Sequence, residues 1–143
     1  MLKGIPKILP PELLAVLCEM GHGDELVIAD GNFPRMAYPQ RVIRCDGHGV
    51  PEVLAAVLQL MPLDTYVEHP TAFMGVPPED PVRPTIWQEY REIISRTEPQ
   101  GAREEFLMKA ELYDRARKAY AVVTTGETAL YANIIVRKGV VTE

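Results

Sequence analysis

The chain has 143 residues, a length at which one domain buries roughly two-thirds of its unfolded surface, so we expect a single domain over residues 1–143 that needs no disulfide or metal for its core. Its 47% apolar and 24% charged residues are typical of a globular protein. A net charge of −5 argues against nucleic acid and against an anionic membrane surface as partners.

Amphipathic and apolar segments alternate through the first half of the chain. Pro11 and Gly21 suit the first turn and the end of a helix. The apolar run that ends in Asp30-Gly31 indicates a buried strand. We predict helices over 11–20 and 51–60, and strands over 25–29, 41–45 and 71–76.

The second half begins with a proline-rich surface loop over residues 76–84. Thr85 and Gln88 form the T-x-x-Q pattern of a capping box and predict a helix that runs to residue 97. We predict a further helix over 110–119, and strands over 106–108, 120–124 and 133–137. Helices that alternate with uniformly apolar strands predict an α/β fold, as one three-layer α/β/α domain with a mostly parallel or mixed sheet.

The two cysteines, Cys18 and Cys45, form no C-x-x-C pair, and two reduced thiols favour the cytoplasm. The first residues are interrupted by prolines and a glutamate, so they do not resemble a signal peptide. No apolar run reaches the roughly 18 residues of a membrane span, so no membrane partner is expected.

His22 stands between two glycines in the loop before the first predicted strand. A loop with so little side-chain bulk lets a small molecule approach the imidazole, and histidine gives and takes protons near neutrality. The structural alternative is a histidine that caps the preceding helix or binds a carbonyl at its end.

Polar residues also follow the first predicted strand and precede the last one. Asp30 lies where ligands bind in open α/β sheets, beyond the carboxyl end of a strand, unless it only closes an Asx-turn with Asn32. Tyr131 and Asn133 combine an apolar ring with hydrogen-bonding groups, which suits a sugar. Their structural alternative is simple packing and a turn.

The sequence gives weaker signals for metal binding and for other classes of site. The three histidines, His22, His48 and His69, could be combined with Asp30 and Glu68 into a metal site, but none has the spacing of a ligand motif. The basic residues Lys109, Arg115, Arg117 and Lys118 fit a solvated helix face. No P-loop, dinucleotide fingerprint or nucleophile elbow is present, so an enzyme of this sequence would need chemistry that requires only proton transfer.

Several segments resemble one family in the same order along the chain. They are G-H-G-D-E-L-V-I-A-D-G-N-F-P from residue 21, L-Y-D-R-A-R-K-A-Y-A-V-V-T-T-G-E from residue 112 and Y-A-N-I-I-V-R-K-G-V from residue 131. The segments P-E-L-L-A-V-L-C-E-M, R-V-I-R-C-D-G and L-D-T-Y fit the same pattern. Together they resemble the fucose mutarotase and ribose pyranase family, the RbsD/FucU type, and are closer to its fucose branch.

The resemblance implies an RbsD-like α/β fold and a homo-oligomer, typically a decameric ring. It also implies an isomerase that needs no cofactor and interconverts the anomers, or the pyranose and furanose rings, of a monosaccharide. The family's catalytic histidine falls on His22 and its sugar contacts fall on Asp30, Tyr131, Ala132 and Asn133. A further sugar contact, arginine or histidine in the two branches, falls on Lys109, which is a departure from both.

The position of the first strand adds a geometric inference. An intact strand over 25–29 places His22 and Asp30 at its opposite ends, about 17 Å or more apart. One monosaccharide cannot reach both, so we predict that a complete site crosses a subunit boundary, or that the His22 loop folds back along the strand. The alternative function is a monosaccharide-binding protein on the same fold that does no catalysis.

Overall fold

Six strands form one mixed sheet in the computed structural model, which describes residues 1–143. The strands are β1 (Glu25–Ala29), β2 (Arg41–Cys45), β3 (Thr71–Met74), β4 (Glu104–Leu107), β5 (Ala121–Thr125) and β6 (Ile134–Arg137), in the spatial order β2-β5-β1-β6-β3-β4. Strand β6 runs antiparallel to β1 and β3, whereas β1–β5, β2–β5 and β3–β4 are parallel pairs. The predicted mixed-sheet α/β fold is therefore confirmed.

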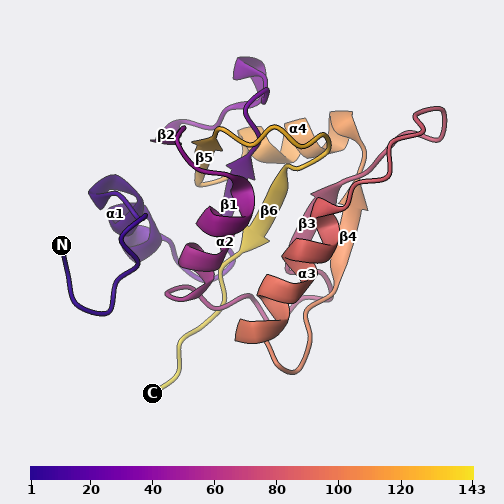
Figure 1. The fold of residues 1–143 in the computed structure, drawn as a ribbon. Coiled ribbons are helices and arrows are strands. Elements are labelled where there is room, and N and C mark those ends of the chain that lie inside the picture. The colour runs from indigo at the N-terminus through magenta and orange to yellow at the C-terminus, as the bar shows by residue number, and fades with distance from the viewer.

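Helices cover both faces of the sheet (Figure 1). One apolar cluster packs α1 (Pro11–Glu19), α2 (Val50–Leu58) and α3 (Ile86–Thr97) against one face. A smaller cluster packs α4 (Lys109–Arg117) and the short 3-10 helix η1 (Arg35–Ala37) against the other. No helix is long and apolar enough to cross a membrane.

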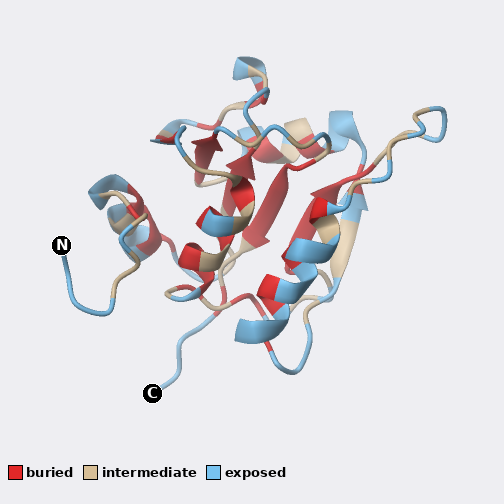
Figure 2. Ribbon diagram, in the orientation of Figure 1, coloured by how far each residue is buried: buried red, intermediate tan, exposed pale blue.

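The position of β1 in the sheet explains why residues 26–29 are all apolar. Leu26 and Ile28 belong to the cluster under α1, α2 and α3, while Val27 and Ala29 belong to the cluster under α4. Alternate residues of a strand point to opposite faces, so a strand covered on both sides is apolar throughout. Figure 2 shows this buried sheet between helices whose outer faces are exposed.

The ends of the strands form two chemically distinct rims of the sheet, which we call the carboxyl edge and the amino edge. The carboxyl edge, at the top of Figure 1, collects the residues that follow the five parallel strands, β1 to β5, and the residues that precede the antiparallel β6. The amino edge collects the residues that precede β1 and follow β6. Asp30 and Asn133 therefore lie at the carboxyl edge, and His22 and Lys138 lie at the amino edge.

Three local predictions need correction, and one short helix was missed. Thr85 makes no side-chain cap bond, and its own backbone is helical, so the predicted capping box is absent. The helix η1 was not predicted, and β4 begins at Glu104 rather than two residues later. Arg115 does not belong to a solvated basic face, because its guanidinium pairs with Glu25 at 2.6 Å and Glu105 at 3.2 Å.

Candidate functional site

The His22 loop is held at the amino edge by short backbone contacts. Gly23 adopts a φ of 88°, a left-handed conformation that favours glycine, and its N–H donates to the Lys138 carbonyl at 2.9 Å. The Gly21 N–H donates to the Asp24 carboxylate at 2.8 Å. The side chain of His22 remains 46% exposed, so the imidazole is open to a small molecule.

Asp64 binds this imidazole from behind. Its Oδ1 lies 2.9 Å from Nε2 of His22, and the Asp64 side chain is only 1% exposed. The same carboxylate accepts a bond from Nε of Arg137 at 2.9 Å and from the Tyr66 N–H at 3.0 Å. The imidazole is therefore not the helix cap that the structural alternative for His22 required.

The protonation of this pair follows from its partners. Burial disfavours the Asp64 anion, but the bonds from Tyr66, His22 and Arg137 outweigh burial and hold the pKa of Asp64 below its ordinary value. An ionised carboxylate only accepts hydrogen bonds, so Nε2 of His22 carries a hydrogen. In neutral His22 the other ring nitrogen, Nδ1, is then the basic one.

Asp64 was not singled out as a site residue from the sequence. It lies 42 residues after His22, beside the isolated bridge between Leu63 and Lys138. Two signals pointed to it: its place in the L-D-T-Y segment, and its being a lone aspartate after the apolar M-P-L run, where a buried carboxylate needs donors.

Asp30 and Asn133 meet at the carboxyl edge. The Asp30 N–H donates to Oδ1 of Asn133 at 2.7 Å, and the Asn32 N–H donates to Oδ1 of Asp30 at 2.9 Å. The Asx-turn is thus real, and Asp30 also interacts with the side chain of Asn133. Burial, supported by the nearby charge of Glu127, raises the pKa of Asp30 against the opposing bond from Asn32.

Two of the predicted sugar contacts, Ala132 and Asn133, lie just before β6 and are both buried. Asn133 is buried, and its Nδ2 faces Sδ of Met74 at 3.3 Å. Ala132 is fully buried, and its carbonyl accepts the hydroxyl of Tyr90 at 2.6 Å. Neither the methyl group nor the backbone of Ala132 is therefore exposed in the single chain.

Tyr131 is held by contacts at both ends. Its hydroxyl donates to Oδ2 of Asp80, in the proline-rich loop, and its carbonyl accepts Nε1 of Trp87 at 3.1 Å. Its φ of 56° is the one positive value outside glycine in the chain. A bulky residue in this conformation is held there by its surroundings.

Lys109 opens α4 at the same edge. Its ammonium lies 5.9 Å from the centre of the Tyr113 ring, which packs edge-on against Phe33 at 5.5 Å. Burial, with a contribution from the charge of Asp30, raises the pKa of Tyr113. The structure thus brings Asp30, Asn133, Tyr113 and Lys109 into one region, with Tyr131 next to it in the chain.

His22 does not join this cluster. Strand β1 is intact, and its pairing runs from Glu25 opposite Arg137 to Ile28 opposite Ile134. His22 and Asp30 therefore lie at opposite edges of the sheet, on the order of 17 Å or more apart by strand length. The loop of His22 bonds to the end of β6 and does not fold back along β1.

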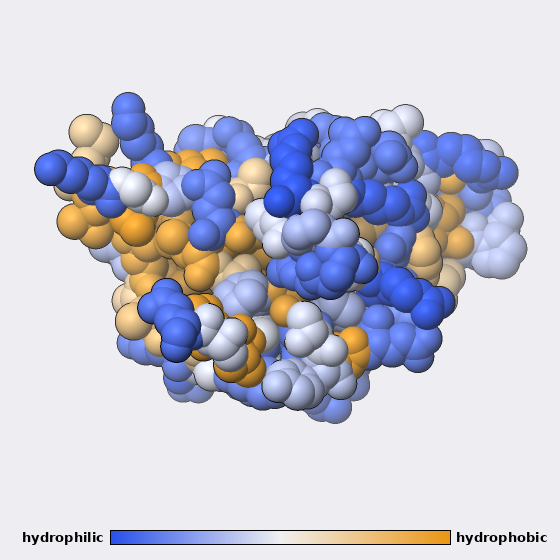
Figure 3. All heavy atoms as spheres, turned by 90° about the horizontal axis from the view of Figure 1, so that it is seen from below, coloured by the Kyte–Doolittle hydropathy of each residue, from blue (hydrophilic) through white to orange (hydrophobic).

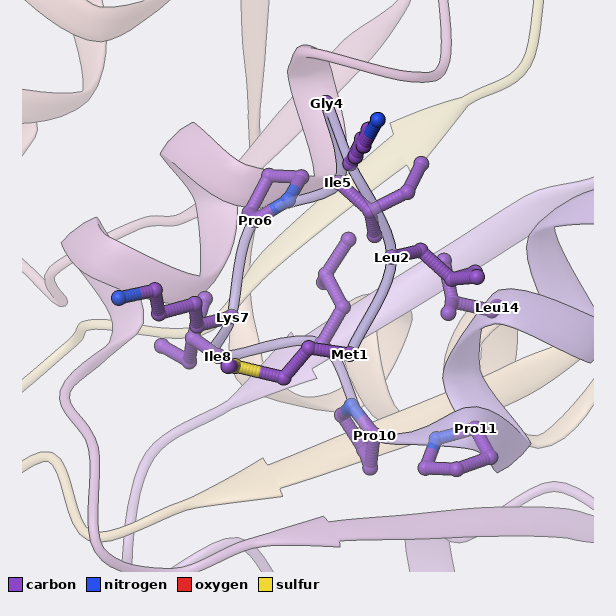
Figure 4. A pocket seen from close by; sticks show the side chains of 12 residues that line it. Met1, Leu2, Gly4, Ile5, Pro6, Lys7, Ile8, Pro10, Pro11 and Leu14 are labelled. Carbon is purple, nitrogen blue, oxygen red and sulfur yellow. The ribbon is translucent and has the colours of Figure 1, made fainter.

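Two cavities of the structure have none of the predicted site residues in their walls. A cavity of about 270 Å³ lies at the amino edge, and its walls are Val67, Glu68, His69, Glu105, Arg115 and Arg137. A larger one of about 830 Å³ lies in the N-terminal segment, whose residues and the start of α1 form its walls (Figure 4). The only ionisable side chains there are Lys3 and Lys7, and none of the predicted site residues lies in its walls.

The histidines are not gathered around a common point. His48 pairs with Glu52 at 3.3 Å, His69 lies 3.8 Å from Glu68, and His22 binds Asp64. No group of three or more histidine, cysteine, aspartate or glutamate side chains lies close enough to hold a metal ion. The metal site considered from composition has no counterpart in this geometry.

Comparison with known proteins agrees with the sequence motifs. A human protein named fucose mutarotase is 52% identical over 97% of this chain and 94% of its own length. A fucose mutarotase from Streptococcus pneumoniae, solved in complex with L-fucose, has 49% identity and a TM-score of 0.90 over 99% of this chain and all of its own. RbsD of Bacillus subtilis, at 24% identity and a TM-score of 0.72, shares the fold. Residues 3–141 match the RbsD / FucU transport protein family, and the chain belongs to this family.

Proposed function

We propose that the protein is a monosaccharide mutarotase, an isomerase that interconverts the anomers of a reducing sugar such as L-fucose. The observation that carries this proposal is the half-exposed His22, oriented by the buried Asp64, in a chain about half identical to proteins named fucose mutarotase. An oriented imidazole at an open position suits a reaction that needs only proton transfer.

The reaction balances without any co-reactant. The proton of the anomeric hydroxyl is removed while another is delivered to the ring oxygen, the bond from C1 to the ring oxygen breaks, and C1 becomes a carbonyl carbon. Rotation about the C1–C2 bond and attack by the same hydroxyl on the other face give the second anomer. His22 exchanges its proton through Nδ1, because Asp64 occupies Nε2. Positioned acid–base groups contribute about 10²–10⁴-fold.

The sugar contacts belong to the carboxyl edge. We assign substrate binding to Asp30, Lys109, Tyr131, Ala132 and Asn133. The partly exposed carboxylate of Asp30 accepts from a sugar hydroxyl, and the ammonium of Lys109 donates to one. The separation of these residues from His22 supports a complete site that crosses a subunit boundary, with His22 from one copy and the carboxyl-edge residues from another.

A homo-oligomer, as a decameric ring, supplies that arrangement. Its subunits need apolar contact surface, and apolar side chains gather on the side of the molecule that carries the N-terminal segment (Figure 3). Met1 and Leu2 are both exposed there. Large exposed apolar patches are common at protein interfaces.

The domain organisation, cofactor use, compartment and partners that we propose are consistent with this activity. The whole of residues 1–143 acts as one domain, the reaction uses no cofactor, and the two unpaired cysteines fit the reducing cytoplasm. The partners are a monosaccharide and further copies of the chain, with neither nucleic acid nor membrane.

Exchange NMR of anomer interconversion tests the proposal. L-fucose, D-ribose and other reducing sugars are compared with the native protein, His22→Ala, and His48→Ala as a matched control on a histidine of similar side-chain exposure. Faster exchange of one sugar that is lost only with His22→Ala supports the mutarotase. Saturation transfer to a sugar without faster exchange would instead establish a binding protein, and the catalytic assignment would fail.

A further inference from the structure

Tyr131 and Asp80 come from segments 51 residues apart, yet their side chains share one hydrogen bond. Asp80 lies in the loop of residues 75–84, which leaves β3 and returns to α3, and which projects at the upper right of Figure 1. We propose that Asp80 is a positioning residue that orients the hydroxyl proton of Tyr131, so that the sugar meets this hydroxyl as a hydrogen-bond acceptor. This inference rests on the proposed function.

The loop holds the Asp80 carboxylate in place. The Asp80 N–H donates to the carbonyl of Pro77 at 3.0 Å, and Oδ1 of Asp80 accepts the Val82 N–H at 3.0 Å. Four prolines of the loop, Pro77, Pro78, Pro81 and Pro84, restrict its backbone. Since Oδ1 is committed to Val82, Oδ2 is the atom that faces Tyr131.

The backbone of Tyr131 is fixed independently of Asp80. Trp87 donates to the carbonyl of Tyr131 at 3.1 Å, and Tyr90 donates to the next carbonyl, that of Ala132, at 2.6 Å. Both donors lie on α3. With the backbone anchored from α3 at a φ of 56° and the ring packed against the apolar cluster under α4, the hydroxyl hydrogen of Tyr131 keeps the freedom to rotate.

The donor and acceptor roles within the pair are set by chemistry. A tyrosine hydroxyl has one hydrogen and two lone pairs, and an ionised carboxylate has no hydrogen. The bond from Tyr131 and that from Val82 lower the pKa of Asp80, and the same bond to Asp80 raises the pKa of Tyr131. The hydrogen therefore stays on Tyr131 and points to Asp80 at neutral pH, which leaves the lone pairs of the hydroxyl for a sugar hydroxyl that donates.

This orientation makes a prediction about substrate choice. A sugar whose contacting hydroxyl is replaced by fluorine can no longer donate, so the native protein binds it worse than the parent sugar. In Asp80→Asn, the amide oxygen keeps the bond from Val82 and the amide nitrogen faces Tyr131 as a donor. The hydroxyl of Tyr131 then turns its hydrogen toward the sugar, and we expect the fluorinated sugar to lose less affinity relative to its parent.

The test measures sugar affinity and the titration of Tyr131 separately. A series of monofluorinated analogues of the bound sugar identifies the contacting hydroxyl, and their affinities are compared in the native protein, Asp80→Asn, Tyr131→Phe and the double variant. We expect Asp80→Asn to weaken the parent sugar about tenfold, a loss typical of one hydrogen bond. On the Tyr131→Phe background the same change should alter affinity by less than about twofold, because Asp80 acts through the hydroxyl that is missing.

Tyrosine ¹³Cζ NMR without sugar gives the second measurement. Asp80→Asn should lower the pKa of the Tyr131 resonance, which is assigned by its loss in Tyr131→Phe. Glu79→Gln is the matched control, since it removes a charge from the same loop without a hydrogen bond to Tyr131, and it should shift that pKa less and leave sugar affinity unchanged.

The outcomes separate the two proposals. If the native protein binds no sugar, the proposed function fails and the role of Asp80 fails with it. If the native protein binds sugar but Asp80→Asn leaves affinity and the Tyr131 pKa unchanged, or weakens binding equally on the Tyr131→Phe background, only the role of Asp80 is overturned.

Discussion

The imidazole of His22 shares a 2.9 Å contact with Asp64, a carboxylate that is 1% exposed and that also binds the side chain of Arg137. One side of His22 is thus fixed by protein and the other is open to solvent. In the proposed mechanism the two ring nitrogens therefore have different roles, since Nε2 holds the orientation of the ring and Nδ1 exchanges the proton.

Replacing Asp64 with Asn tests this division of roles. The amide cannot hold Nε2 of His22 and Nε of Arg137 as an anion does, so we expect anomer exchange to slow at least about tenfold, a part of the 10²–10⁴-fold typical of acid–base groups. Asp114→Asn, on the exposed face of α4, is the control and should keep the native rate. Equal rates in native protein and Asp64→Asn would remove Asp64 from the mechanism.

Asp64 also makes the fold sensitive to acid. Its pKa is lowered in the folded state, so the stability it contributes is present above the unfolded value of about 3.9 and is lost as pH falls through the folded value. Urea unfolding at a series of pH values should therefore show a smaller acid loss in Asp64→Asn than in the native protein. A parallel acid loss in both proteins would contradict this account.

Sugar binding should weaken in acid at a higher pH than an ordinary aspartate predicts. In the proposed site Asp30 accepts a sugar hydroxyl as an anion, and burial together with the charge of Glu127 raises its pKa. Titration of the dissociation constant against pH in native protein and Glu127→Gln checks this. The variant should move the loss of affinity to lower pH, whereas the exposed control Glu92→Gln should not.

Glu127 also holds nearby backbone in place, so we expect Glu127→Gln to lower the stability of the protein as well. Its carboxylate accepts the N–H groups of Val50, Thr128 and Ala129 at 3.1 Å each. The pH shift must therefore be read from the midpoint of the titration and not from absolute affinity, which a looser loop would also lower.

The hydroxyl of Tyr90 should matter to stability. Tyr90 is fully buried, and Tyr90→Phe leaves the buried carbonyl of Ala132 without its 2.6 Å donor. We expect a loss of about 1–3 kcal/mol in the free energy of unfolding, measured by urea denaturation. Tyr38→Phe, on a partly exposed tyrosine whose hydroxyl makes no bond within the chain, is the control and should lose much less.

Lys109 is expected to set sugar preference more than rate. The ammonium of Lys109 is a compact charge, whereas a guanidinium presents a planar fork of hydrogen-bond donors. We therefore expect Lys109→Arg to change the ratio of the L-fucose exchange rate to the D-ribose exchange rate several-fold. Lys118→Arg, near the other end of the same helix and paired with Asp114, serves as the control. An unchanged ratio would show that Lys109 does not contact the discriminating part of the sugar.

The sequence by itself determined the order of the elements and the character of the sheet. The apolar run of β1 and its ending at Asp30 are local patterns, and so is the glycine-flanked position of His22. Because a strand has a fixed rise per residue, local pattern alone also placed His22 and Asp30 at opposite ends of β1. The family followed from motifs that recur in order along the chain.

Only the tertiary structure decided which distant side chains meet. Asp64 reaches His22 across 42 residues and Asp80 reaches Tyr131 across 51, and neither contact leaves a periodic signal in the sequence. The ion pairs of Arg115 with Glu25 and Glu105 have the same origin, since partners from other strands draw this side chain away from solvent. Periodicity reports which face of an element is buried, whereas the partner of a polar group depends on how the sheet brings separate loops to one edge.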